Sequence, residues 1–534
     1  MSEYFDYVIV GAGAAGCVLA NRLSEDPNTS VLLLEAGGKD WSPLLKIPAG
    51  FSRLMGTKYN WLFTTTPQQH MNNRQMFLPQ GKVLGGSTSI NAMLYIRGNR
   101  RDYDEWRDQG NVGWGYDDVL PFFKKSERNQ RFNNEYHGAA GELGVSDQLE
   151  INPLAHAFVR AAQQAGIPFT ADPNGREQDG VYYNQLTQRD GKRSSASQAF
   201  LQPILKSRSN LVVRTNARVF RVNVEDGRAS GVSYFRGNNT VTVCARRETI
   251  VSAGPINSPQ LLMVSGIGDA VQLGQLGIPV VHHLPGVGKN LHDQLEVNIT
   301  AKINVPLSYD RQDRYWNAAR HALQWLIYRR GPATATVSQG GAFIRTNSEV
   351  RSPDIQIHME PAYVVWSEGV SKKIQRVPGH GITLISVNVR PKSRGEVTLA
   401  SSDIRDFPKI NPNFLSDPHD RETSMAGFKT LRRIMAQPEL ARYIVREETP
   451  GSSIQEDDEI QAFIRQYGVT DFHPVGTCKM GHDDTAVVDE KLRVHGVPGL
   501  RVIDSSIMPS IISGNTQAAS FMIGEKGADM IRNC

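Results

Sequence analysis

The chain has 534 residues, of which 40% are hydrophobic and 21% charged, and its formal net charge is +5. This length is too great for one ordinary domain, so the sequence predicts two domains, consecutive or interleaved, with enough apolar residues for a large core. Because no run of Lys and Arg dominates, the mild positive charge argues against a nucleic-acid-binding protein and leaves open only a weak attraction to anionic membrane surfaces.

The cysteines and the N-terminal region indicate a compartment. Cys17, Cys244, Cys478 and Cys534 are scattered and form no disulfide framework, which is typical of a reducing environment. No signal-peptide pattern precedes the first predicted strand, and no run of roughly 18 apolar residues predicts a transmembrane helix. We therefore expect a cytoplasmic protein, with peripheral association at the inner face of the membrane left open by its charge.

The first forty residues carry a nucleotide-binding pattern. Tyr7–Val10 is a short apolar run that predicts a strand buried on both faces, and a glycine-rich turn over residues 11–16 follows it and opens a helix. Val31–Leu34 predicts a second parallel strand, with Glu35 at its carboxyl end. Because these parts occur in the required order, the pattern predicts a dinucleotide site rather than a plain glycine turn.

Each glycine of this turn has its own physical role. Gly11 permits the tight turn, Gly13 lets the backbone approach a pyrophosphate, and Gly16 lets the helix and strand pack closely. The helix N-terminus offers unpaired N–H groups to the phosphates. Glu35 can accept hydrogen bonds from the adenosine ribose. Whether the dinucleotide is NAD or FAD is left open by this stretch.

A second glycine-rich turn lies further along the chain, within Gly81–Gly98. Its Gly-Gly-Ser-Thr-Ser run over residues 85–89 leads into an apolar segment. Backbone amides in such a run can cradle an anion or a planar ring, although a plain loop before a core helix is the alternative. The length of the small-residue run favours a ligand.

A helix is predicted after the strand that ends at Val251. Ser258 can cap this helix, Pro259 suits its first position, and Gly266 ends it. The other predicted elements are strands at residues 211–217, 219–222, 355–359, 382–389 and 396–399, a mostly helical stretch at 415–447, and a C-terminal helix at 516–531. The mixture over residues 301–460 predicts a sheet with helices on one side.

The C-terminal region carries the residues best suited to chemistry. Removal of a proton from a hydroxyl group needs a base, and a neutral imidazole with a pKa of ~6.5, lowered further by burial, suits that task at neutral pH. His473 precedes Pro474, which favours an extended backbone. Asn515 offers an amide that can stabilise the substrate oxygen as negative charge develops. A core histidine is the alternative interpretation of His473.

A metal site was considered for the same region, because His473, Cys478 and His482 fall within ten residues. Tetrahedral zinc requires four donors, and no nearby Cys or His pair completes the set. We therefore predict that the chain binds no metal there.

These stretches together resemble the glucose–methanol–choline (GMC) oxidoreductases, FAD enzymes that oxidise alcohols. The resemblance rests on the first forty residues, Gly81–Gly98, Asp102–Trp106, Ser252–Gly268, Gly286–Leu291, Pro391–Gly395 and the tail from His473. It covers nearly the whole chain, least clearly residues 300–385.

The resemblance implies an α/β fold, α+β overall, in which a Rossmann-like FAD-binding domain is interleaved with a substrate domain built on an antiparallel sheet flanked by helices. The FAD-binding domain would comprise residues 1–155, 195–300 and 465–534, and the substrate-binding domain residues 156–194 and 301–464.

The resemblance also implies roles for individual residues. His473 matches the family's catalytic base and Asn515 its His/Asn partner, so the reaction would be oxidation of a primary alcohol to the aldehyde by hydride transfer to the flavin N5. FAD contacts would come from Gly11, Gly13, Ala14, Ala15, Gly16, Glu35, Ala36, Gly85, Ser87, Asn91, Ala92, Val219, Asp504, Thr516 and Gln517. Asp504 could instead only cap a turn. Because residue 90 is Ile and no His lies in residues 85–91, we expect FAD to bind non-covalently.

The substrate is predicted only by class. Phe472 beside the base suggests an apolar wall suited to aliphatic or aromatic primary alcohols. Choline would call for aromatic faces and a carboxylate, which Tyr363, Trp366, Trp316 or Tyr328 and Glu360 or Glu368 could supply.

The electron acceptor would be a quinone, a dye or oxygen, with a dehydrogenase favoured over an oxidase. The alternatives to this function are choline dehydrogenase proper, an oxidase using oxygen, a lyase on the same fold, a plain NAD-dependent dehydrogenase and a non-catalytic flavoprotein.

Overall fold

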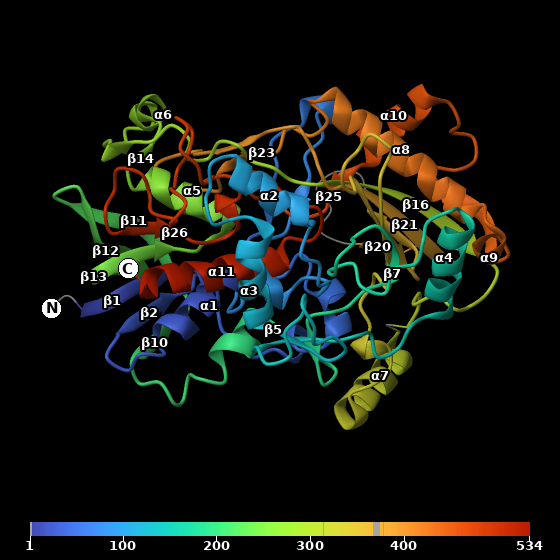
Figure 1. Cartoon of the computed structure of the whole chain (residues 1–534), viewed down its shortest axis with the longest axis horizontal. Helices are drawn as coiled ribbons and strands as arrows, with labels where there is room; N and C mark the ends of the chain where they lie inside the picture. Colours follow the sequence, from blue (N-terminus) through green and yellow to red (C-terminus); the bar gives the residue numbers. More distant parts are fainter. Residues whose placement is uncertain (1–2, 313, 367–373, 377–378, 534) are drawn as a thin grey trace.

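The computed structural model describes residues 3–312, 314–366, 374–376 and 379–533. Two large sheets lie side by side, one with the N-terminal strands and one with the strands of the middle of the chain (Figure 1). Both the predicted fold class and the presence of two sheets are confirmed. The domain boundaries stay a prediction.

The first sheet has a parallel core. Its parallel strands, in spatial order, are β10 (Leu211–Arg214), β2 (Val31–Leu34), β1 (Glu3–Val10), β13 (Asn239–Val251) and β26 (Leu500–Val502). The antiparallel strands β12 (Arg228–Arg236) and β11 (Ala217–Glu225) extend the sheet beside the first half of β13. Helices α1 (Ala14–Leu23) and α11 (Gln517–Arg532) pack against each other over it (Figure 1). The carboxyl ends of β1, β2 and β13 therefore meet at one edge, where ligands of such sheets bind.

The second sheet is antiparallel. Its strands, in spatial order, are β24 (Ile444–Thr449), β16 (Leu295–Ile303), β21 (Gly381–Asn388), β18 (Ile355–Glu360), β17 (Gly340–Ile344) and β7 (Gly180–Tyr183), with β25 (Val469–Thr470) also beside β16. One face is apolar and is covered by α4 (Pro153–Gln164), α8 (Pro418–Met435) and α10 (Asp457–Tyr467). Because side chains alternate along a strand, the opposite face carries residues such as Glu296, His358 and Glu360.

Short elements connect the two sheets. Further helical segments are α2 (Arg100–Asp108), α3 (Tyr116–Ser126), α6 (Ala270–Gln275), α7 (Tyr315–Tyr328), α9 (Pro438–Ala441), η1 (Pro43–Leu45), η2 (Pro48–Arg53), η3 (Gln69–Met71), η4 (Gly86–Ser89), η5 (Ser197–Leu201), η6 (Pro332–Thr334) and η7 (Ser505–Ile507). Two-stranded pairs are β3 (Phe63–Thr64) with β4 (Phe77–Leu78), β5 (Glu127–Asn129) with β6 (Leu143–Val145), β8 (Gln188–Arg189) with β9 (Lys192–Arg193), β14 (Ile267–Gly268) with β15 (His282–His283), β19 (Val364–Trp366) with β20 (Ile374–Arg376), and β22 (Glu396–Thr398) with β23 (Lys409–Asn411).

Most elements predicted from the sequence are present, with shifted bounds. The stretch 415–447 is helical as α8 and α9 but ends in an edge strand, because β24 begins at Ile444 and pairs with β16. The predicted start of the helix after β13 was wrong: α5 spans Gly254–Val264 and so begins before Ser258.

Pro259 is tolerated inside α5 for a specific reason. It has no N–H to donate to the carbonyl of Pro255 four residues earlier. That carbonyl instead accepts the hydroxyl of Thr477 at 2.6 Å. The break in the backbone ladder is thus repaired by a side chain of the C-terminal segment.

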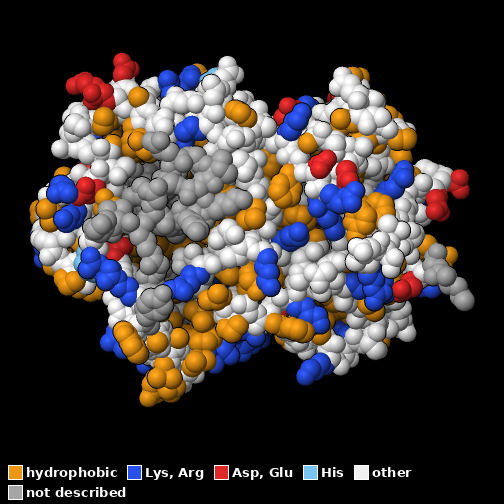
Figure 2. Space-filling model, turned by 180° about the vertical axis from the view of Figure 1, so that it is seen from behind, with side chains coloured by type: hydrophobic (Ala, Val, Ile, Leu, Met, Phe, Trp, Pro, Cys, Tyr) orange, Lys and Arg blue, Asp and Glu red, His pale blue; other side chains and the backbone are white. Residues whose placement is uncertain are grey.

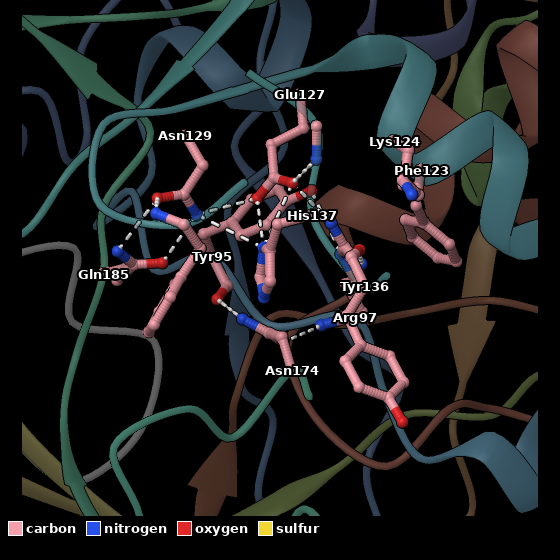
Figure 3. Close-up of polar contacts among 12 residues, drawn as sticks. Tyr95, Arg97, Phe123, Lys124, Glu127, Asn129, Tyr136, His137, Asn174 and Gln185 are labelled. Atoms are coloured by element: carbon pink, nitrogen blue, oxygen red, sulfur yellow. Dashed lines mark hydrogen bonds and ion pairs between the residues drawn. The ribbon is translucent and has the colours of Figure 1, made fainter. Parts of the chain in front are cut away.

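A buried ionic network fastens the loops between the sheets (Figure 3). The Arg97 guanidinium lies 2.6 Å from a carboxylate oxygen of Glu127, and the His137 ring bridges Glu127 at 3.0 Å and Asp172 at 2.9 Å. Burial alone lowers the pKa of His137, but the two carboxylates outweigh it and raise that pKa. The charges of Arg97, Glu127, His137 and Asp172 are paired within the network, so its role is structural.

Candidate active site

A cavity extends from the glycine turn after β1 to the polar face of the second sheet. The predicted site residues that line it are Gly11, Gly13, Ala14, Ala15, Glu35, Ala36, Ser87, Asn91, Ala92, Val219, Phe472, His473, Asp504, Asn515, Thr516 and Gln517. Gly16 and Gly85, which were also predicted, do not line the cavity. Residues from both ends of the chain and from both sheets therefore meet around one space.

The first glycine turn fits a pyrophosphate. Gly11 has a φ of +102°, and a Cβ at Gly16 would stand 1.9 Å from the Gly11 carbonyl oxygen, so both positions need glycine. A Cβ at Gly13 would meet no atom within 4 Å, because this position faces the cavity directly before α1. The N–H groups at the start of α1 are thus presented to the cavity, as a bound phosphate requires.

The second glycine turn packs on the first. The Gly85 amide donates to the Ala12 carbonyl at 2.8 Å, and a Cβ on Gly86 would come within 2.8 Å of the Gly13 Cα. Gly85 and Gly86 both have positive φ, which favours glycine. The predicted ligand loop is therefore placed beside the nucleotide turn, with Ser87 and Asn91 on its cavity side.

Glu35 joins the nucleotide turn to the end of β2. Its carboxylate oxygens accept from the backbone amides of Ala12 at 2.9 Å and Gly37 at 2.7 Å. Burial raises the pKa of Glu35 to about 7. The side chain lines the cavity and retains free lone pairs, so the ribose contact predicted for it is compatible with its position.

Asp504 and Gln517 already have protein partners. Asp504 caps η7 by accepting from the Ser506 amide at 2.8 Å, and its second oxygen accepts from the Ser258 hydroxyl at 2.6 Å. The Asn91 amide donates to Gln517. Asp504 thus performs the capping role considered as its alternative, while it also lines the cavity.

The His473 backbone is held by the segment that directly precedes β16. The amide of His473 donates to Asp293 at 2.9 Å, and Phe472 before it has a left-handed φ of +64°. Asp293 in turn accepts the hydroxyl of Thr470 on β25. Burial raises the pKa of Asp293 to about 7.

The orientation of the His473 ring follows from Gln294. The Gln294 amide nitrogen donates to the Ile512 carbonyl at 3.0 Å, so its oxygen faces the ring and lies 2.8 Å from Nδ1. A neutral ring therefore carries its proton on Nδ1. The lone pair of Nε2 then faces the cavity side, where Asn515 Nδ2 lies 3.3 Å away. A neutral His473 is thus poised to accept a proton at Nε2.

Asn515 is oriented by the second sheet. The Gln356 amide of β18 donates to its Oδ1 at 3.2 Å, which leaves the Asn515 NH₂ group to face the His473 ring. Both side chains line the cavity, so the pair predicted from the sequence is brought together by the fold.

The expectation of a lowered pKa for His473 was wrong. Burial does act in that direction, but the charge of Asp471, whose Oδ2 lies 3.1 Å from Nδ1, outweighs it and raises the pKa of His473. The same pairing holds the pKa of the Asp471 carboxyl below its usual range. Asp471 was not identified from the sequence, because only the fold shows which carboxylate faces a histidine.

Three further titratable residues of the second sheet line the cavity, and of these only Glu360 was considered from the sequence, as a carboxylate for choline. Burial raises the pKa of Glu360 to about 8 and raises the pKa of Glu296, while it lowers the pKa of His358. Among the described residues, none donates a hydrogen bond to the Glu360 carboxyl. The alternating pattern of a strand is the only sequence signal that could have placed Glu296 and Glu360 on this face.

Most candidates for an aromatic choline site do not reach the cavity. Trp316 and Tyr328 lie on the exposed surface, and Tyr363 does not line the cavity. The side chain of Trp366 and all of Glu368 lie outside the described residues. Of these candidates, Glu360 does line the cavity.

The described residues contain neither a metal-binding cluster nor a membrane-spanning helix. Within the part of the chain that the structure describes, no three His, Cys, Asp or Glu side chains are grouped to hold a metal ion. His482 instead lies 3.4 Å from Glu490. In the same residues no helix has the length and apolarity that crossing a bilayer requires.

Matches to protein-family models show which family the chain belongs to. The GMC oxidoreductase models match residues 5–296 and 391–524. The chain belongs to the GMC oxidoreductase family. It is thus an FAD-dependent oxidoreductase that acts on alcohols, as the resemblance implied.

Full-length relatives agree with this assignment. The chain is 44% identical to the alcohol dehydrogenase [acceptor] of Pseudomonas putida, over 99% of this chain and 95% of that protein. It is also 44% identical to the oxygen-dependent choline dehydrogenase of Pseudomonas aeruginosa (strain LESB58), over 100% and 95% of the two chains.

Solved structures of this family share the fold. Pyridoxine 4-oxidase from Mesorbium loti superimposes with a TM-score of 0.89 at 31% identity, over 99% of both chains. A formate oxidase variant of Aspergillus oryzae RIB40, studied for its FAD modification, superimposes with a TM-score of 0.92 at 26% identity, over 100% of this chain and 99% of that one. Both structures superimpose on nearly the whole of this chain.

Proposed function

We propose that this GMC oxidoreductase oxidises a primary alcohol to the aldehyde, with His473 as the base and Asn515 as its partner. The observation that carries the proposal is the pairing of Asn515 Nδ2 with His473 Nε2 at 3.3 Å on the lining of the cavity. An alcohol oxygen beside both groups would find a proton acceptor and a hydrogen-bond donor together.

The protein's own residues have distinct tasks in this reaction. When bound, FAD supplies the acceptor for the hydride that leaves the carbinol carbon with its electron pair. His473 Nε2 takes the hydroxyl proton, and the Asn515 NH₂ group donates to the oxygen as it becomes negative. Asp471 stabilises the imidazolium that forms, because its carboxylate lies 3.1 Å from Nδ1.

We further propose that FAD binds non-covalently, along the two glycine turns. The residues present fit a dinucleotide, since the space at Gly13 is open and the α1 N-terminus faces it. The loop over residues 85–91 contains no histidine that could form a covalent link. Contacts with the remaining predicted cofactor residues, and the domain boundaries given above, belong to the same proposal.

The electron acceptor and the cellular location are further parts of this proposal. A quinone or dye acceptor would make the protein a dehydrogenase, which the relative named alcohol dehydrogenase [acceptor] supports, whereas the relative named oxygen-dependent choline dehydrogenase keeps oxygen as the alternative acceptor. We propose a cytoplasmic location with peripheral contact to the membrane. Choline is the alternative substrate, favoured by the name of one relative and by the cavity carboxyls of Glu296 and Glu360.

Product analysis tests the function against the lyase alternative. The holoenzyme is incubated without oxygen with a panel of primary alcohols, choline included, and with a dye as acceptor. We expect one molecule of aldehyde for each two-electron reduction of the dye. Aldehyde released without reduction of the dye would indicate a lyase, and neither product with any alcohol would contradict the proposed function.

A further inference from the structure

Helix α7 presents an apolar face to solvent. Trp316, Leu323, Leu326, Ile327 and Tyr328 are exposed by 88%, 58%, 58%, 59% and 69%. Spacings of seven and four residues place Trp316, Leu323 and Ile327 along one side of the helix. A surface helix of a soluble protein normally turns its polar side outward, so the apolar outward side of α7 is unusual.

The opposite side of α7 is fixed to the body of the protein. Trp325 is buried, and its indole nitrogen donates to the Gly191 carbonyl at 2.6 Å. His321, one turn earlier, is also buried and lies 2.9 Å from the Gln312 side-chain oxygen. The exposed apolar side chains are therefore held outward by a helix anchored on its inner side.

The charged side chains of α7 itself and of the residues at its two ends are basic. Arg314, Arg320 and Arg330 are exposed at the start, middle and end of the helix, and residues 315–328 include no Asp or Glu. Helix α7 projects at the lower right of Figure 1. In the reverse view of Figure 2 apolar side chains gather at the lower left, with Lys and Arg around them. Aromatic and aliphatic residues flanked by arginines are typical of helices that lie in the headgroup region of anionic bilayers.

The chain that follows α7 leads to the active-site cavity. Segment η6 packs against η2, and Phe51 of η2 lines the cavity. Val337 and Ser338, which follow η6, line it as well. Any partner that binds the outward face of α7 would therefore lie close to the wall of the cavity.

We propose that the outward face of α7 is a docking surface for an anionic lipid bilayer. The helix lies in the interface plane, with its apolar side chains among the acyl chains and Arg314, Arg320 and Arg330 at the headgroups. This inference goes beyond the proposed reaction and does not depend on it, because docking needs only the folded chain.

Vesicle flotation of the full-length holoenzyme tests the docking surface. We expect binding to vesicles of phosphatidylglycerol and phosphatidylcholine, weaker binding to phosphatidylcholine alone, and loss of the difference at high salt. The double variant Leu323→Glu, Ile327→Glu should lower the vesicle partition coefficient at least about tenfold. The variant Arg320→Glu, Arg330→Glu should lower binding to the anionic vesicles only.

A matched control separates docking from general surface change. Val271 on α6, at the opposite end of the molecule in Figure 1, and Val112 are exposed by 70% and 76%. The variant Val112→Glu, Val271→Glu adds the same charge and should bind vesicles like the unmodified protein. All variants should reduce a soluble dye with a soluble alcohol at the unmodified rate, which shows that they are folded.

Three results would overturn the proposal. One is absence of binding to anionic vesicles, and another is an equal loss of binding in the α7 and control variants. The third is a dimer in light scattering that becomes a monomer in Leu323→Glu, Ile327→Glu without any vesicle binding, since the face would then cover a second copy of this chain.

Discussion

The Nδ2 atom of Asn515 lies 3.3 Å from the Nε2 atom of His473, although the two residues are 42 positions apart in the chain. Each side chain is oriented by an amide on the second sheet or at its edge: Gln356 holds Asn515 and Gln294 holds His473. The reactive pair is therefore positioned by the sheet, while the glycine turns that fit the cofactor belong to the other sheet.

Removal of the Asn515 amide tests its part in this pair. We expect Asn515→Ala to slow anaerobic reduction of the bound flavin by an alcohol about 10²- to 10³-fold, because one donor to the developing oxyanion is lost. Stopped-flow absorbance measures this rate, and the visible spectrum before mixing shows whether the flavin is still bound. A rate within twofold of the unmodified enzyme would remove Asn515 from the mechanism.

The pairing of His473 with Asp471 predicts a pH dependence. Because Asp471 raises the pKa of His473, the neutral base forms, and flavin reduction accelerates, as the pH rises through a value above 6.5. Asp471→Asn removes the charge, so this rise should move to lower pH. A pH profile of the reduction rate that does not move in Asp471→Asn would show that Asp471 does not control the base.

The same shift has a consequence for stability, with a definite sign. The folded pKa of His473 is higher than its unfolded value, so the contribution of this residue to stability is fully present below about pH 6.5 and is lost as the pH rises through the folded pKa. Asp471→Asn should therefore lower Tm more at pH 5.5 than at pH 8.5. Thermal unfolding of the holoenzyme at the two pH values measures it, and equal losses would contradict the ion pair.

Glu360 predicts a second loss of stability as the pH rises, with burial as its cause. Burial raises the pKa of Glu360 to about 8, so its ionisation is disfavoured in the folded protein and stability falls as the pH rises from about 4.5 to 8. Glu360→Gln cannot ionise. Its Tm relative to the unmodified protein should thus be higher at pH 8 than at pH 5, and a difference independent of pH would contradict the assignment.

Two glycines of the nucleotide turn predict contrasting variants. Gly13→Ala keeps an allowed backbone, with φ at −78°, and adds a methyl group to open space, so the protein should fold but bind FAD more weakly. Gly16→Ala places a Cβ 1.9 Å from the Gly11 carbonyl oxygen and should cost at least about 3 kcal/mol of folding free energy. Flavin content and circular dichroism of the purified variants separate the two outcomes. Equal flavin content in Gly13→Ala and the unmodified protein would show that the methyl group does not face the cofactor.

Those parts of the site that lie within one short stretch of sequence could be located from the sequence. Gly11, Gly13 and Gly16 have fixed spacing beside a strand and a helix, so a local pattern predicted their turn. His473 was selected from its place in the tail and lines the cavity, and its catalytic role stays a prediction. The helix start at Ser258 failed because Pro259 suggested a first turn, whereas Thr477 satisfies the carbonyl that this proline leaves free.

The environment of His473 could not be predicted in the same way. Gln294, Asp471 and Gln356 reach His473 and Asn515 only because β25 pairs with β16, and both β16 and β18 pair with β21, although these strands are far apart in sequence. Without that pairing, burial appeared to be the dominant influence on the pKa of His473, and the sign was wrong. Glu296 was missed and Glu360 was one of two candidate carboxylates, since an alternating strand does not show what faces it.

The most direct test of the account is anaerobic reduction of the bound flavin by a primary alcohol in the unmodified holoenzyme and in His473→Ala. We expect the alcohol to bleach the flavin absorbance near ~450 nm in the unmodified enzyme, an expectation of the cofactor's chemistry. In His473→Ala, with flavin still bound, the rate should fall about 10²- to 10⁴-fold. An unchanged rate in His473→Ala, or a flavin that no alcohol bleaches, would contradict the central claim.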